Sequence, residues 1–187
     1  IVKIARENEV CPFELELDLS LFCDLIICDY NYVFDPISYM KRYFDEDASH
    51  YLALVDEAHN LVDRSRDMYS ASISYTSFLL ARKSIRRVKH SRLKRMMGKL
   101  EKMFKELSSI YPFGNHIVED FSEEQYKLFI AFINLMQDLN KNEHELVSRE
   151  LLDFYLEVNR FMKIGEFFNE RYIAYYQIQN DLKLHLF

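Results

Sequence analysis

A short apolar run that stops on two carboxylates constrains the fold of this chain more than any other stretch. Residues 51–55 (Tyr-Leu-Ala-Leu-Val) are followed at once by Asp56 and Glu57. A run of this kind predicts a strand buried on both faces of a sheet. Groups at the carboxyl end of such a strand reach the crevice where α/β sheets bind ligands. Asp56 and Glu57 are therefore candidate site residues, and the alternative is a strand that ends in a solvated acidic turn.

A second apolar run supports a small parallel sheet. Residues 25–28 (Leu-Ile-Ile-Cys) predict another buried strand, with Cys28 inside it, and residues 29–36 close it with turn-forming side chains. Residues 36–44 predict a helix, and acidic residues 45–49 predict a loop before the strand at 51–55. Two strands joined through a helix form a βαβ unit, which is how neighbouring parallel strands are connected.

The rest of the chain predicts helices. With only 3 Gly and 3 Pro, the sequence favours long helices with few tight turns. The periodicity predicts one long amphipathic helix or two in line over 79–108 with a break near Gly98, a helix opened by a capping box at Ser122, helices over 142–162 and 166–180, and a strand at 182–187. We therefore expect a mostly α fold: a small α/β portion over 1–70, a helical portion over 71–181, and a strand at 182–187 that returns to the first portion.

The helical portion carries a concentrated positive charge. Residues 82–105 contain eleven Lys or Arg and one acid, Glu101, although the whole chain has a net charge of −6. Eight of these cations are candidate contacts for DNA phosphates: Arg82, Lys83, Arg86, Arg87, Lys89, Arg92, Lys94 and Arg95. A solvated helix face is the equally weighted alternative. Tyr30, Tyr32, Tyr175 and Tyr176 could stack on bases, but with 13 Tyr in the chain a packing role is expected for any one of them.

Three motifs resemble one known family. Residues 11–14 (Cys-Pro-Phe-Glu), 28–36 (Cys-Asp-Tyr-Asn-Tyr-Val-Phe-Asp-Pro) and 54–61 (Leu-Val-Asp-Glu-Ala-His-Asn-Leu) occur in this order. They resemble the DinG/XPD-like iron–sulfur DNA helicases of superfamily 2, over about the first third of the chain. In that family a mostly helical arch domain follows the Asp-Glu-Ala-His strand. The resemblance implies that 1–70 is part of a P-loop NTPase-like motor domain 1, that 71–181 is the arch, and that 182–187 returns to the motor domain.

The resemblance also implies residue roles. Asp56 would hold Mg²⁺, Glu57 would polarise the water that attacks the γ-phosphate of ATP, and His59 would couple the nucleotide site to the DNA-binding motifs. Cys11 would be the last of four thiolate ligands of a 4Fe–4S cluster, with an ordinary turn cysteine as the alternative. Cys23 and Cys28 do not supply the other three, which would lie upstream.

The chain departs from a complete ATPase because it lacks a phosphate-binding loop and a second motor domain to supply an arginine finger. Phosphate binding needs a Gly-x-x-x-x-Gly-Lys-Ser/Thr loop, and none of Gly98, Gly114 and Gly165 fits that pattern. We therefore expect a piece of a longer ATP-dependent DNA helicase, with 5′ to 3′ polarity if the family rule holds, acting in DNA repair or replication. Alone, this piece is expected to lack ATPase activity. Its expected partners are single-stranded DNA and the remainder of the helicase chain.

Other classes are weighed beside this one. The helical portion could be a protein-interaction module whose basic helix meets an acidic partner, or a nuclease-like arch variant, although no metal-binding acid cluster supports the latter. No apolar run is long enough for a membrane span, so no membrane partner is expected. Three cysteines without the spacing of a secreted scaffold favour a reducing cytoplasm.

Overall fold

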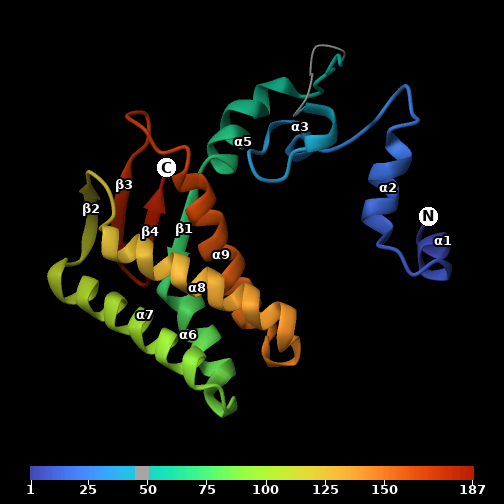
Figure 1. Ribbon diagram of the computed structural model, residues 1–187. Coiled ribbons are helices and arrows are strands. Elements are labelled where there is room, and N and C mark those ends of the chain that lie inside the picture. Colours follow the sequence, from blue (N-terminus) through green and yellow to red (C-terminus); the bar gives the residue numbers. More distant parts are fainter. Residues whose placement is uncertain (45–50) are drawn as a thin grey trace.

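A computed structural model describes residues 1–44 and 51–187, so the loop predicted at 45–49 lies outside the described residues. Figure 1 shows a compact part built from helices and one sheet, while α1 and α2 lie apart from it. The helical elements are α1 (Val2–Glu7), α2 (Pro12–Ser20), α3 (Asn31–Phe34), α4 (Lys41–Phe44), η2 (Ala58–Asn60), α5 (Leu61–Met68), α6 (Tyr75–Ser84), η3 (Ile85–Arg87), α7 (Ser91–Ile110), α8 (Glu123–Asn142), η4 (His144–Leu146) and α9 (Arg149–Gly165).

The described strands form one antiparallel sheet. They are β1 (Ala71–Ser74), β2 (Gly114–Val118), β3 (Ala174–Ile178) and β4 (Leu182–Leu186), in the spatial order β1-β4-β3-β2. Ala71 faces Leu186, Tyr176 faces Leu184, and His116 faces Tyr176. The expected mostly α fold is thus present, but its sheet is antiparallel and lies outside the segment where the parallel one was predicted.

The predicted parallel strands at 25–28 and 51–55 are wrong. Both segments are irregular, and their apolar side chains face solvent: Ile27 is 92% exposed and Leu52 is 88% exposed. Cys28, expected inside a strand, is exposed as well. The physical reason is that a strand exists only through hydrogen bonds to a neighbouring strand. Among the described residues neither segment has such a neighbour.

Several helix boundaries also differ from expectation, and the helix predicted over 36–44 is only α4, Lys41–Phe44. The chain breaks at residues 85–90 rather than at Gly98, because η3 ends α6 and the ring Nδ1 of His90 accepts the Leu93 N–H at 3.1 Å to cap α7. The helix expected to start at 142 begins instead at Arg149, where Ser148 provides the N-cap. A side chain that accepts a backbone N–H, here His90 or Ser148, sets the helix start more strongly than periodicity does.

The helix predicted over 166–180 is wrong, and β3 occupies its second half. Ala174–Ile178 pairs with β2 on one side and β4 on the other. Tyr and Ile suit a pleated surface, and Tyr176 is buried on the inner face of the sheet. The strand predicted at 182–187 is confirmed as β4, whose partners in the sheet are β1 and β3.

Aromatic side chains fill the core between the sheet and the helices. Phe78 of α6 lies 5.3 Å from Phe104 of α7 and 5.6 Å from Phe154 of α9, measured between ring centroids. All three are fully buried. Edge-to-face and tilted ring pairs add about 0.5–1.5 kcal/mol each to the free energy gained from burial. This core fixes α6, α7 and α9 relative to one another and therefore positions the basic residues between α6 and α7.

Candidate functional site

The first candidate site is the turn that carries the acid motif. Glu57 has a left-handed backbone (φ 49°, ψ 40°) and precedes the short 3₁₀ helix η2, which leads into α5. For a residue other than glycine this backbone conformation costs about 1–3 kcal/mol, so the surrounding structure must hold it. Two contacts hold it here: an Asp56 Oδ1 atom accepts the Glu57 N–H at 2.9 Å, and the Asn60 N–H donates to the Glu57 carbonyl at 2.9 Å.

Tyr30 ties this turn to the second motif. Its hydroxyl donates to the backbone carbonyl of Asp56 and lies 3.3 Å from the carbonyl of Glu57. Tyr30 opens α3, so the motif at 28–36 and the motif at 54–61 meet in space. Sequence reasoning gave Tyr30 a stacking or packing role and missed this contact. The only signal for this contact in the sequence was that both motifs resemble the same family.

The side chains of the acid motif are open to solvent. Asp56, Glu57 and His59 are all exposed, and the Nδ1 atom of His59 lies 3.2 Å from the Glu57 carboxylate. The geometry thus brings the three predicted residues together on one short turn. Both carboxylates remain accessible to a ligand from the solvent side.

The donor set fits Mg²⁺ bound together with a phosphate ligand. Mg²⁺ keeps several waters and is usually held by one or two carboxylates plus substrate phosphates. Within the described residues there is no group of three or more His, Cys, Asp or Glu able to hold a metal by itself. The single exposed carboxylate of Asp56 can therefore hold Mg²⁺ only if phosphate oxygens complete the coordination shell of the metal.

The described residues do not complete an iron–sulfur site. Cys11 sits at the N-cap of α2, and Cys11, Cys23 and Cys28 are all exposed. Partial burial, with the nearby Asp29 carboxylate, raises the pKa of the Cys28 thiol and so disfavours its thiolate. A 4Fe–4S cluster needs four ligands, and these three cysteines form no ligand group. The same finding within the described part gives the nuclease alternative no support.

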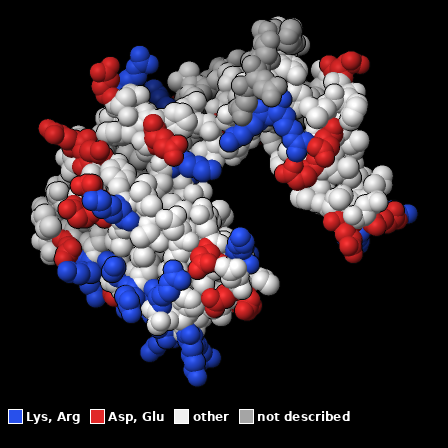
Figure 2. Space-filling view, viewed as in Figure 1, with Lys and Arg blue, Asp and Glu red and all other residues white. Residues whose placement is uncertain are grey.

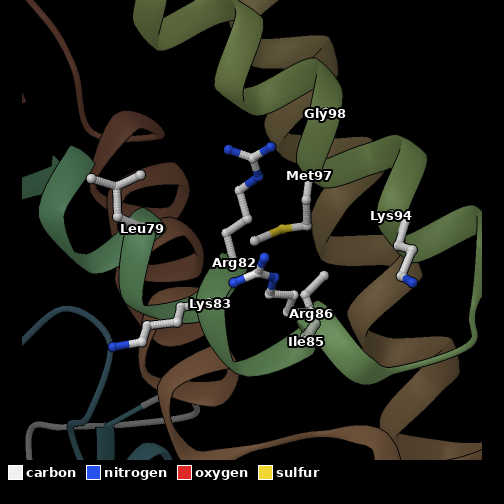
Figure 3. Close-up of a pocket in the computed structure, with 8 residues that line it drawn as sticks. All are labelled: Leu79, Arg82, Lys83, Ile85, Arg86, Lys94, Met97 and Gly98. Atoms are coloured by element: carbon white, nitrogen blue, oxygen red, sulfur yellow. The ribbon is translucent and has the colours of Figure 1, made fainter.

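The second candidate site is a basic groove between α6 and α7. An open cavity of about 570 Å³ is lined by Leu79, Arg82, Lys83, Ile85, Arg86, Lys94, Met97 and Gly98. Figure 3 shows the Arg82 and Arg86 guanidinium groups between the two helices, with Lys83 and Lys94 on either side of them. Figure 2 shows Lys and Arg side chains gathered over this part of the molecule.

The eight predicted cations are all exposed, but they differ in their partners. Arg82 forms an ion pair with Glu101, and Arg92 lies 3.4 Å from Asp138. Lys105 also contacts Glu101, at 3.0 Å, and its hydrogen bond together with the nearby Arg82 lowers the pKa of Glu101. Within the described residues the other six make no ion pair: Lys83, Arg86, Arg87, Lys89, Lys94 and Arg95. These six therefore remain available to an anionic ligand.

Comparisons with known proteins agree with the motifs. The DEAD_2 family model matches residues 1–78. Regulator of telomere elongation helicase 1 homolog from Caenorhabditis briggsae is 34% identical over 87 residues, which is 46% of this chain and 9% of that protein. Fanconi anemia group J protein homolog from Gallus gallus is 26% identical over 117 residues, 58% of this chain and 9% of that protein. The chain thus spans about a tenth of the length of these curated relatives.

A solved structure matches most of the fold. The structure named XPD_Helicase superposes with a TM-score of 0.62 at 20% identity, covering 98% of this chain and 31% of that one. At this identity the likeness concerns the fold. Among the described residues, no helix is both long and apolar enough to cross a membrane. The DEAD_2 match over residues 1–78 and these relatives confirm the resemblance to DinG/XPD-like superfamily 2 helicases that the motifs predicted, and the shared fold agrees with it.

Proposed function

We propose that this chain is part of an ATP-dependent DNA helicase and supplies one edge of its nucleotide site and one surface for single-stranded DNA. The observation that carries this proposal is the contact between Tyr30 and the carbonyls of Asp56 and Glu57, which joins two family motifs at one turn. The phosphate-binding loop would come from elsewhere in the longer protein. The chain alone is therefore expected not to hydrolyse ATP.

In this proposal the two acids have different tasks. Asp56 contributes a carboxylate oxygen to Mg²⁺, and the bound metal would neutralise charge on the phosphates. Glu57 orients and polarises the attacking water. His59, 3.2 Å from the Glu57 carboxylate, links that acid to the start of α5. Residues 1–70 are then part of motor domain 1, 71–181 the arch, and 182–187 the return to the motor domain. A 4Fe–4S cluster held by Cys11 would need upstream cysteines.

Substitution of Glu57 tests the nucleotide part. In the full-length protein, Glu57→Gln should still bind ATP and Mg²⁺ but lose hydrolysis by roughly 100-fold or more, because the amide cannot accept a proton. Glu9→Gln, another exposed glutamate with a positive φ, is the matched control and should keep full turnover. Retained turnover in Glu57→Gln would refute its catalytic role.

The DNA part of the proposal concerns the basic groove. Phosphate contacts from exposed Lys and Arg give binding that does not depend on base sequence and weakens steeply with salt. The chain should therefore bind an oligo-dT probe with a Kd that rises strongly between about 50 and 200 mM salt. DNA repair and 5′ to 3′ translocation are the proposed setting of this binding.

Charge reversal at Arg86, which lines the groove, and at the adjacent exposed Arg87 tests this surface. Arg86→Glu with Arg87→Glu should weaken binding to oligo-dT and lower the salt slope by about two, one unit for each lost phosphate contact. Arg149→Glu with Arg171→Glu, two exposed arginines outside the groove, is the matched control and should bind as the unchanged chain does. If oligo-dT binding does not depend on salt, or if both double variants lose binding equally, the groove does not bind DNA.

A further inference from the structure

Arg160 of α9 contacts two segments of the acid-motif region at once. Its Nη1 atom lies 3.5 Å from the carboxylate of Asp35. Its Nη2 atom donates to the carbonyl of Met68 at 2.7 Å and lies 3.3 Å from the carbonyl of Asp67. Met68 is the last residue of α5, so the guanidinium caps the carbonyl end of that helix.

Asp35 is a fixed anchor for this arginine. Its side chain is 6% exposed, and its other carboxylate oxygen accepts the N–H groups of Ile37 at 2.8 Å and Ser38 at 2.9 Å. Its own N–H donates to the Asn31 carbonyl at 3.2 Å, which closes the end of α3. A carboxylate held this tightly cannot follow a moving arginine without pulling α3 with it.

Both segments held by Arg160 lead directly to the acid motif. In one direction the N-cap of α3 is Tyr30, whose hydroxyl contacts the carbonyls of Asp56 and Glu57. In the other direction α5 follows η2, which starts directly after Glu57. The contacts therefore close a ring from Glu57 through α5, Arg160, Asp35 and α3 back to Glu57. Figure 1 shows α5 near one end of α9 and α3 next to α5.

On the basis of the proposed function, we infer that Arg160 is a positioning residue that couples the helical portion to the nucleotide-site turn. α9 packs against α6, α8 and the sheet, so a displacement of the helical portion on binding DNA moves Arg160 with it. The guanidinium passes that displacement to α5 and α3 together, and so to both sides of Asp56 and Glu57. Coupling of this kind needs a physical element that both sites bias, and the ring provides one.

Arginine suits this position better than lysine. Its planar fork offers donors in several directions, so it can meet a carboxylate and two carbonyls together. A lysine ammonium is a single point that can reach one side of the ring but does not span both. Arg160→Lys should therefore restore only part of the coupling lost in Arg160→Ala.

The ATPase of the full-length protein tests the coupling. Arg160→Ala should lower the DNA-stimulated kcat roughly threefold to thirtyfold, while the Kd for oligo-dT and the ATPase rate without DNA stay within about twofold. Asp35→Asn keeps an oxygen for the Ile37 and Ser38 N–H groups but loses the charge, and it should show the same change. Arg149→Ala, on the same helix and 91% exposed, is the matched control and should match the unchanged protein.

A DNA-stimulated kcat equal to that of the unchanged protein, in either Arg160→Ala or Asp35→Asn, would overturn the inference. If one of the two variants fails to fold, the other still provides the test. If the unchanged protein lacks DNA-stimulated hydrolysis, the proposed function fails instead. The positioning role is then tested by measuring amide hydrogen exchange in this 187-residue chain. Arg160→Ala should speed exchange of the Asn60 N–H by roughly threefold or more relative to Arg149→Ala, because that N–H reports the turn at Glu57. Equal exchange in the two variants would overturn it.

Discussion

The hydroxyl of Tyr30 lies 3.3 Å from the backbone carbonyl of Glu57, although 27 positions separate the two residues. The same hydroxyl donates to the carbonyl of Asp56. Glu57 holds a strained left-handed backbone, so this contact helps to keep an acidic turn in a conformation that it would not adopt alone. Tyr30 is thus a structural support for the candidate catalytic acid, through backbone atoms rather than through the acid itself.

Removal of the Tyr30 hydroxyl should loosen the acid turn. Tyr30→Phe keeps the ring but removes the hydroxyl from both carbonyls, so the Glu57 carbonyl keeps the Asn60 N–H as a donor. The variant should reduce the free energy of unfolding by about 0.5–1.5 kcal/mol, toward the lower end because the contact is exposed. Urea unfolding measures this loss. Tyr32→Phe, whose ring stacks on Phe13 with centroids 6.3 Å apart, is the control and should change stability less. Equal effects in both variants would contradict a support role for Tyr30.

Gly98→Ala should stabilise the chain. Gly98 lies inside α7, and a Cβ atom placed there would meet nothing within 4 Å. Alanine restricts the unfolded chain and favours helix, so we expect a gain of about 0.5–1 kcal/mol in the free energy of unfolding. The contrasting variant is Gly114→Ala, whose φ of +138° strains any side chain, and it should destabilise. A loss of stability in Gly98→Ala would mean that α7 does bend at this residue.

Glu157 should make stability depend on pH. Burial raises the pKa of this carboxyl above its ordinary value, and Asp181 adds to the effect, although hydrogen bonds from Ser77 and Ser74 oppose it. The folded protein then holds the Glu157 proton more tightly than the unfolded chain does. Its contribution to stability is therefore fully present below about pH 4.5 and is lost as the pH rises through the raised pKa.

Glu157→Gln checks this sign. The amide oxygen can still accept the Ser74 N–H, which now lies 2.6 Å from the Glu157 carboxylate, but carries no charge to desolvate. The variant should be more stable than the unchanged chain at pH 7, and the difference should shrink as the pH falls to about 4.5. Thermal unfolding across this range measures it, with the exposed Glu150→Gln as control. A constant difference at every pH would contradict the burial argument.

Substitution of Gln125 should reduce the free energy of unfolding more than substitution of an ordinary helix-capping residue does. Its side-chain oxygen accepts the Ser122 N–H at 2.8 Å in the capping box and the Tyr176 hydroxyl at 3.0 Å, and Gln125 and Tyr176 are both buried. Gln125→Ala leaves both donors without that acceptor and should cost about 1–3 kcal/mol. Adding Tyr176→Phe removes one stranded donor, so the double variant should lose less than the sum of the single losses. Strict additivity would contradict the shared acceptor.

Local signals in the sequence determined several elements. Ser122 with Gln125 predicts the start of α8, and both hydrogen bonds of the capping box are present. Pro12 is the first residue of α2, where proline suits the start of a helix, and Cys11 is its N-cap. The alternation of Leu182, Leu184 and Leu186 predicts β4, whose leucines are buried on one face. In each case the deciding atoms lie within a few residues of one another.

The motifs predicted the family resemblance in the same way, because three short segments in a fixed order can be recognised before the fold is known, and the DEAD_2 match over residues 1–78 confirms it. They also identified Asp56, Glu57 and His59, which the structure brings together on one turn. The roles of these residues and of the basic groove remain predictions until the experiments above are done.

Tertiary structure alone decided where strands form and what joins the parts. Residues 25–28 and 51–55 have strand-like sequences but remain irregular, since no described strand lies beside them. Residues 174–178 were predicted to be helical, but they form β3 because β2 and β4 flank them. Likewise nothing in the sequence pairs Arg160 with Asp35, 125 positions apart. Periodicity reports which face of a segment is apolar, but hydrogen bonds between distant segments depend on the packing of the whole chain.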